Sequence, residues 1–440
     1  MKRNPLISRT HFFAYGGNTT TMTALKNKYT ATKIACYFGY VTQAAVVNLA
    51  PLLFVIFREQ YGVSYEMLAR IVLINFAVQI CADLVSIKLA QHFSLRTLSA
   101  AAHFLCAAGL VMFAVFPQVF SNGYIGILLS TVFYAFGGGM IEVVVNPVID
   151  ACDSEENSEK SPAAIAFLHS FYCWGHVCVV LLSTLFLRAF GNSSWYILPL
   201  LWAIIPTANI LLFLTVKMPG CDANDEKISL KSLFSSKLFI FAALLMLSAG
   251  ASEQAVAQWS SIFAEKGLGV SKTVGDILGP MSFAVCMAII RIAGGLLGSK
   301  VDTRKLLAAS AALCIFSYGI MVFVKIPVIS LIGCSLCGFA VGFMWPGVLA
   351  LSSKEIPNGG ASMFGVLAFF GDVGCSLGPW VAGIVSDIAG QNADSLSSLP
   401  FFSSLDTDAI GLKCGLLAAI IFPLIMLVVI TMFKKSKNKK

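Results

Sequence analysis

Long apolar runs restrict the fold of this chain more than any other feature of its sequence. Twelve stretches of about 20 residues carry few charged side chains, and a helix of that length spans a hydrocarbon core of roughly 30 Å. Only 12% of the residues are charged and 58% are hydrophobic, so a soluble domain would have too few polar residues to cover its surface. The sequence therefore predicts an all-α membrane protein with twelve transmembrane helices. Their approximate bounds are Ile34–Phe57, Met67–Leu89, Leu98–Phe116, Tyr124–Ile149, Ala163–Leu187, Trp195–Val216, Leu238–Phe263, Ile277–Leu297, Leu306–Val324, Val328–Ser352, Met363–Val385 and Cys414–Phe433.

Polar segments divide these runs into two groups of six. The segment at 217–237 separates the groups and is rich in Asp, Glu and Lys, as a solvated linker would be. The sequence leaves open whether Met1 or Met22 starts the protein. The predicted segments are a cytoplasmic N-terminal segment (1–30), an N-terminal six-helix bundle (31–216), a cytoplasmic linker (217–237), a C-terminal six-helix bundle (238–433) and a basic cytoplasmic tail (434–440).

The distribution of positive charge predicts the orientation in the membrane. If the N-terminus lies inside the cell, 22 of the 30 Lys and Arg residues fall in inner segments and six in outer ones. That excess fits the positive-inside rule with both termini in the cytoplasm, so we expect a multi-pass protein of the plasma (inner) membrane. The net charge of +8 does not indicate nucleic acid as a partner, because the basic residues lie in short clusters between apolar runs.

The two groups of helices also repeat each other weakly. Residues Leu89–Arg96 align with Leu297–Arg304 at an offset of 208, and each copy joins the second and third helices of its group. Such self-similarity is typical of transporters built from two related halves. We therefore expect two pseudo-symmetric six-helix bundles.

The helix count, the linker and the basic loops at Arg96 and Arg304 resemble the major facilitator superfamily over residues of about 30–433. This resemblance implies the major facilitator fold. The loop motif of that superfamily has an acidic residue before its basic pair, whereas Gln91 and Ser299 occupy the corresponding positions here.

One motif in the fourth predicted helix resembles the proton-coupled fucose permease group within that superfamily. The stretch GGGMIEVVVNP at 137–147 has a Glu followed four and five residues later by Asn-Pro, as in that group. The resemblance implies a role for Glu142 in proton translocation. The group also has an Asp in its first helix, and this chain has no acid there.

Ionisable residues inside apolar runs are candidates for coupling. Such a residue costs roughly 2.5–3.5 kcal/mol to insert, so it normally faces a cavity or a partner. Glu142 lies just before the helix-breaking Pro147, Asp372 lies near mid-depth in a glycine-rich helix, and Glu253 lies among amides. We expect these three carboxyl groups to carry protons, although each could instead be a structural strut.

Polar side chains near mid-depth are candidates for binding a solute. Amides and aromatic rings suit the hydroxyl groups and ring faces of sugars, although amides also join helices to each other. We expect a site formed by helices 1, 4, 5, 7 and 11. Its candidate residues are Tyr40, Gln43, Asn146, His169, His176, Gln254, Gln258 and Trp259.

Other charged residues favour gating or structural roles. Asp83 ends a polar stripe with Asn75 and Gln79 on one face of the second helix, and it could form an inner gate or a salt bridge. Arg291 is expected to pair with an acid of another helix. Arg96 and Arg304, in the repeated loops, complete this group.

Metal and nucleotide chemistry is not indicated. Most of the 13 Cys residues lie in apolar runs, including the pair Cys334 and Cys337, and there they resemble small hydrophobic residues. No metal site is expected, and no P-loop or hydrolase motif is present to suggest nucleotide binding or an enzyme.

These features predict a secondary active transporter for a small polar solute that works by alternating access, and most specifically a proton-coupled sugar symporter. A proton-driven exporter of drugs or metabolites is the first alternative, and a membrane sensor that does not transport is the second. We expect a monomer in the lipid bilayer that binds a small molecule, needs no cofactor and uses a proton or other ion gradient.

Overall fold

The computed structural model describes residues 28–90, 92–157, 162–219, 234–297, 302–356 and 360–432, and within them it contains helices and no strands. The predicted tail, most of the predicted N-terminal segment and most of the linker lie outside these residues. Eleven described helices are long and apolar enough to cross a membrane, and a bent pair supplies a twelfth. The predicted all-α fold with twelve membrane helices is confirmed.

The N-terminal half contains six spans. Its first span is bent by 46° at Leu53 and so consists of two helices. The elements are α2 (Thr30–Leu52), α3 (Phe54–Tyr61), α4 (Tyr65–Leu89), α5 (Leu95–Val119), α6 (Gly123–Asn157), α7 (Pro162–Phe190), the 3-10 turn η1 (Asn192–Ser194) and α8 (Ile197–Thr215).

The C-terminal half is less regular, because two of its spans contain π-helical turns and a third has a break after Val341. The second span of this half, which is the eighth of the chain, starts at Lys272, five residues before the predicted start at Ile277. The elements are α10 (Lys237–Ile262), η2 (Phe263–Gly267), α11 (Lys272–Asp276), η3 (Ile277–Met281), α12 (Ser282–Leu297), α13 (Thr303–Phe323), α14 (Pro327–Val341), α15 (Met344–Glu355), α16 (Gly360–Gln391), α17 (Ala393–Leu396), α18 (Thr407–Ala419) and α19 (Ile421–Met432).

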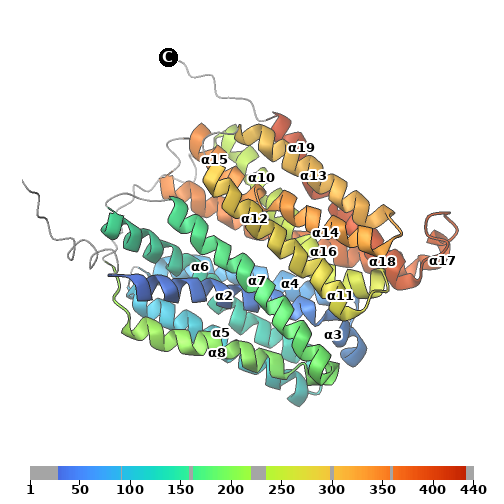
Figure 1. Ribbon diagram of the computed structural model, residues 1–440, viewed down its shortest axis with the longest axis horizontal. Helices are drawn as coiled ribbons and strands as arrows, with labels where there is room; N and C mark the ends of the chain where they lie inside the picture. The colour runs from blue at the N-terminus through green and yellow to red at the C-terminus, as the bar shows by residue number, and fades with distance from the viewer. Residues whose placement is uncertain are drawn as a thin grey trace, which may run out of the picture.

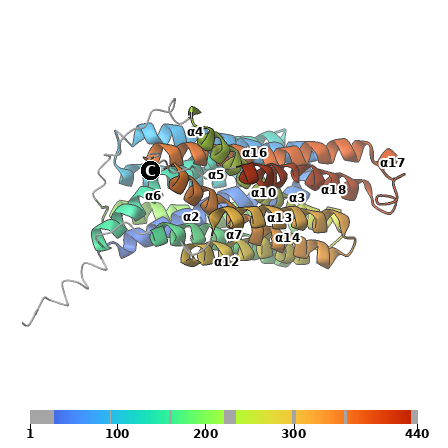
Figure 2. The same cartoon turned by 90° about the horizontal axis from the view of Figure 1, so that it is seen from above.

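The helices of both halves run along one long axis of the molecule (Figures 1 and 2). Helices from blue to green form one side of the bundle in Figure 1, and helices from yellow to red form the other. The chain enters α2 and leaves α19 at the same end, which we call the terminal end. The end that carries α17 is called the opposite end (Figure 1).

Small residues bring α10 and α16 into close contact. A Cβ atom added at Gly374 would overlap the carbonyl of Leu247, and one at Gly378 would overlap the carbonyl of Ala251. Glycine at such positions lets two membrane helices approach until their backbones touch. This contact fixes the position of the nearby Asp372 relative to α10.

Two ionisable side chains inside the spans serve packing. The His103 ring makes hydrogen bonds with the Ser99 carbonyl at 2.7 Å and with the Asn209 amide at 2.8 Å, which joins α5 to α8. Lys413, which directly precedes the predicted span Cys414–Phe433, is buried in α18 and donates to the Val322 carbonyl at 2.8 Å. The ammonium group thus binds the carbonyl end of α13, where the helix dipole is negative.

Charged side chains join the two halves at the opposite end. Arg58 of α3 forms an ion pair with Asp408 of α18 at 3.0 Å. The Asp387 carboxylate of α16 accepts hydrogen bonds from the backbone N–H groups of Tyr65 and Glu66 at 3.0 and 2.7 Å. A carboxylate at a helix N-terminus is favoured both by the free N–H groups and by the helix dipole. The opposite end is therefore held together across the two halves.

We predict that Gly374→Ala destabilises the protein by about 1–3 kcal/mol, because the added methyl group pushes α16 away from α10. The measurement is thermal unfolding of the purified protein in detergent. Gly319→Ala in α13 is the matched control, since a Cβ atom there meets nothing within 4 Å. Equal stability of the two variants would show that the α10–α16 contact is not tight.

Candidate functional site

A cavity of about 310 Å³ lies between the two halves. Eight of the spans contribute to its wall, four from each half. The lining residues are Tyr40, Gln43, Val47, Phe76, Gln79, Glu142, His169, Tyr172, Glu253, Gln254, Arg291, Trp345, Pro346, Leu349, Asp372 and Cys375.

Three carboxylate side chains face this cavity from α6, α10 and α16. Glu142 accepts a hydrogen bond from the Gln43 amide at 2.6 Å. Asp372 is 6% exposed, and no described residue donates a hydrogen bond to its carboxylate. Glu253 is 5% exposed and pairs with Arg291. The structure thus brings together the three acids that the sequence singles out, and they come from both halves.

Arg291 is the one Lys or Arg side chain among the described lining residues. Its Nη2 atom lies 2.9 Å from the Glu253 carboxylate, which is the pairing with another helix that the sequence predicts. Its Nη1 atom lies 3.5 Å from the Cys173 sulfur of α7, across the boundary between the halves. The pair cancels its own charge, so the cavity has no excess positive charge to attract an anion.

Tyr40 and His169 form one wall of the cavity. The Tyr40 hydroxyl donates to the Asn146 side-chain oxygen at 3.1 Å and lies 3.4 Å from the His169 ring. The Asn146 amide donates in turn to the Glu142 carbonyl at 2.8 Å. Asn146 therefore orients Tyr40 and contacts the cavity only through it.

Aromatic residues that sequence reasoning missed complete the wall. Tyr172 lines the cavity, and its hydroxyl accepts a hydrogen bond from Asn48 at 3.3 Å. Trp345 rests its indole ring on Gly371, where a Cβ atom would overlap the ring. In an apolar run such residues look like ordinary core or lipid-facing side chains. The one available signal was the glycine beside Asp372, which leaves room for a large ring.

Gln79 is the polar residue of α4 that reaches the cavity. Its side chain is 2% exposed, and its Nε2 atom has no partner among the described residues. A buried donor without a partner costs about 1–3 kcal/mol, so this amide is suited to donate to a bound solute. Gln79 belongs to the predicted polar stripe but not to the predicted solute site.

Besides Asn146, three of the predicted solute contacts lie outside the cavity lining. His176 is buried away from it. Gln258 donates its amide to Gln254 at 2.8 Å, and the Trp259 indole donates to the Pro379 carbonyl at 3.0 Å. The amide of Gln258 and the indole of Trp259 hold helical segments in place, because the protein itself accepts their hydrogen bonds.

The remaining predicted charges also lie away from the cavity. Asp83 is half-buried and forms no ion pair with any described residue. Arg96 donates to the Leu214 carbonyl at 2.6 Å, at the end of α8. Arg304 pairs with Glu355 at 2.9 Å, within the C-terminal half. Both arginines of the repeated loops therefore connect elements of their own half.

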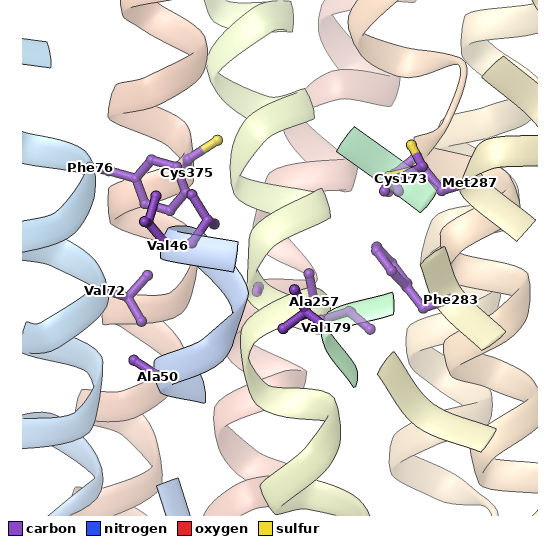
Figure 3. Close-up of a cluster of buried hydrophobic side chains, with 14 of the residues drawn as sticks. Val46, Ala50, Val72, Phe76, Cys173, Val179, Ala257, Phe283, Met287 and Cys375 are labelled. Carbon is purple, nitrogen blue, oxygen red and sulfur yellow. The ribbon is translucent and has the colours of Figure 1, made fainter. Parts of the chain in front are cut away.

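An apolar cluster borders the cavity on the side of the opposite end. In Figure 3 Phe76 and Cys375, which line the cavity, lie beside each other next to Val46. Further along the helices, Val179 of α7 and Ala257 of α10 belong to the same buried cluster. Because these side chains are buried, they separate the cavity from the opposite end.

The sequence matches the profile of the Major Facilitator Superfamily over residues 12–379. The chain belongs to this superfamily. It is thus an integral membrane transporter of small molecules and not an enzyme. No curated protein sequence matches the chain.

Solved structures agree with this fold. The chain is similar to a nucleoside transporter, NupG, with a TM-score of 0.70, 16% identity, and coverage of 93% of this chain and 98% of that one. It is similar to the E. coli fucose:proton symporter FucP with a TM-score of 0.61, 16% identity, and coverage of 93% and 100%. A D-xylose-proton symporter gives a TM-score of 0.68, 13% identity, and coverage of 90% and 97%.

We predict that Arg291→Met and Glu253→Gln each destabilise the protein, Arg291→Met by about 3–5 kcal/mol, because it leaves a buried carboxylate without its partner. The double variant should lose less than the sum of the two single losses. Thermal unfolding in detergent of all three variants checks this.

The exposed pair Arg70–Glu66 at 2.6 Å provides the control, since surface pairs contribute about 0–1 kcal/mol. Strictly additive losses of stability in the Glu253 and Arg291 variants would contradict the pairing. Losses no larger than those of matching variants at Glu66 and Arg70 would also contradict it.

Proposed function

We propose that this protein is a symporter that couples the uptake of a small, uncharged polar solute, such as a sugar, to protons. The observation that carries the proposal is the cavity, in which unpaired carboxyl groups from both halves face amides and aromatic rings. Transporters of this type bind solute and coupling ion near the middle of the membrane, and their halves rock around that site.

The cavity wall supports a neutral, hydroxyl-rich solute. Tyr172 and Trp345 offer ring faces, and Gln43, Gln79 and Gln254 offer amides. Such groups provide both the apolar contact and the hydrogen bonds that a sugar ring needs. The charge of Arg291 is matched by Glu253, so an anionic solute would have to compete with a buried carboxylate.

Glu142 and Asp372 support proton coupling. Neither forms an ion pair with a described residue, and each side chain faces the cavity. Burial in a medium of low dielectric favours the neutral form of a carboxyl group, so a proton is a natural ligand for it. A solute that binds one protonation state more tightly shifts the equilibrium between the two conformations. Glu253 is a third candidate because solute binding at Arg291 would change its pairing.

The comparisons support the same class of function. The similar structures are those of a nucleoside transporter, a fucose:proton symporter and a D-xylose-proton symporter, all of them at low sequence identity. We also propose that the protein is a monomer in the plasma membrane with both termini in the cytoplasm. The distribution of Lys and Arg favours this orientation. The proton gradient drives it without a cofactor.

One feature favours the alternative of a proton-driven exporter of drugs or metabolites. Aromatic and apolar side chains make up much of the cavity wall, including Phe76, Tyr172 and Trp345, and such a wall also suits flat apolar molecules. Efflux of a panel of fluorescent dyes from cells that produce the protein distinguishes the two functions. Dye efflux that depends on the proton gradient would replace the symporter proposal.

We predict that Glu142→Gln and Asp372→Asn abolish proton uptake driven by solute in proteoliposomes. The external pH is followed while fucose, D-xylose or uridine is added without a membrane potential. Both variants should retain exchange of labelled solute across the membrane, because the amide preserves the shape of the site but cannot release a proton.

The exposed Asp394→Asn at the opposite end is the matched control and should behave as the unaltered protein does. Solute entry without a pH change in the unaltered protein would refute proton coupling. Unchanged proton movement in both variants would show that other groups carry the proton.

A further inference from the structure

A buried polar cluster joins the two halves between the cavity and the opposite end. Its centre is Asp276, which is completely buried at the end of α11. The carboxylate accepts hydrogen bonds from Thr184 of α7 at 2.7 Å and from Ser261 of α10 at 2.5 Å. Lys272, one turn earlier on α11, lies 3.3 Å from the same carboxylate. We call these four side chains the Asp276 cluster.

The cluster also reaches the bend in the first span. The Lys272 ammonium donates to the backbone carbonyl of Leu52 at 2.8 Å. Leu52 ends α2, and the chain turns by 46° into α3 just after it. Carbonyl groups at the end of a helix need partners from outside the helix. Lys272 provides one, and so links the C-terminal half to the bend.

The contacts of the cluster fall into two groups according to the half that supplies them. Lys272, Asp276 and Ser261 all belong to the C-terminal half, so the ion pair moves as one body. From the described part of the N-terminal half, the cluster receives only neutral groups, the Thr184 hydroxyl and the Leu52 carbonyl. Separation of the halves here breaks two hydrogen bonds and leaves no charge without its partner.

From this division we propose that the Asp276 cluster is a latch that closes the opposite end of the transporter and opens without breaking its ion pair. When the halves separate, water replaces the hydrogen bonds with Thr184 and Leu52. Water also hydrates the Lys272–Asp276 ion pair, whose burial costs free energy. The closed state gains two hydrogen bonds to charged groups instead. The polar groups of the cluster therefore have hydrogen-bond partners in both states. A gate that must both open and close requires this.

Local packing holds the latch in register. A Cβ atom on Gly275 would come within 2.8 Å of the Ala264 side chain, so glycine lets α11 lie against η2 beside Asp276. The cluster is flanked by the π-helical turns η2 and η3. Such turns are frequent at functional sites. The buried residues Val179 and Ala257 lie on the same helices α7 and α10 as Thr184 and Ser261, and water would reach them when the latch opens (Figure 3).

The test measures how often the opposite end opens, and it needs neither the solute nor the coupling ion. Ala257→Cys introduces a thiol at a site that is 6% exposed in the closed state. Purified protein in detergent is treated with N-ethylmaleimide, and the modified peptide is followed by mass spectrometry, so that the native cysteines do not interfere. A second series with Ala50→Cys, at a site that is 4% exposed, guards against local damage.

Thr184→Val is the decisive variant, because it removes one latch bond and leaves the ion pair intact. A hydrogen bond to a charged group shifts an equilibrium by roughly 10- to 100-fold, so we expect labelling to accelerate by about 10-fold or more. Thr184→Ser keeps the hydroxyl and should label at the unaltered rate. Thr42→Val is the matched control, since among the described residues that buried hydroxyl bonds only to the Phe38 carbonyl of its own helix.

Faster labelling in Thr184→Val alone supports the latch. Labelling at the unaltered rate in a folded Thr184→Val protein, in both thiol series, overturns it. An equal acceleration in Thr42→Val also overturns it, because loosened packing and not the latch would then account for the faster labelling. Folding of every variant is verified by its unfolding temperature and by size-exclusion chromatography.

Discussion

The low dielectric of the membrane interior is the constraint on which this structure depends. A charge there must have a partner or face water. Arg291 pairs with Glu253 at the cavity, and Lys272 pairs with Asp276 nearer the opposite end. Lys413 uses the carbonyl end of a neighbouring helix instead. Carboxyl groups that form no ion pair with a described residue differ from these structural charges. Two of them, Glu142 and Asp372, face the cavity.

Close packing decides where that cavity can exist. Glycine residues bring α16 against α10, and Gly371 leaves space for the Trp345 ring. Where the helices touch backbone to backbone no cavity remains, and where large rings hold them apart a space opens between the halves. The same helix α16 therefore supplies a tight contact through Gly374 and a cavity wall through Asp372.

Sequence reasoning predicted the fold well because each span must be apolar along its whole length, which is visible residue by residue. It also found Glu142, Glu253 and Asp372, since an acid inside an apolar run costs free energy unless it faces a cavity or a partner. It could not place Trp259 and Gln258, because an indole or amide binds a solute or a neighbouring helix with equal ease. It missed Trp345 and Tyr172 for the converse reason, as aromatic residues are ordinary in such runs.

The Asp276 cluster shows why the remaining residues could not be found from sequence. Lys272 and Asp276 lie at the predicted boundary of a span, where charges are common and normally exposed. Their burial depends on Thr184 and on the bend at Leu53, far away in the chain. Because both ion pairs of the central region, at 253 and 291 and at 272 and 276, lie within the C-terminal half, the halves can part there without separating opposite charges. This arrangement suits a transporter that changes conformation inside a membrane, where an unpaired charge costs free energy.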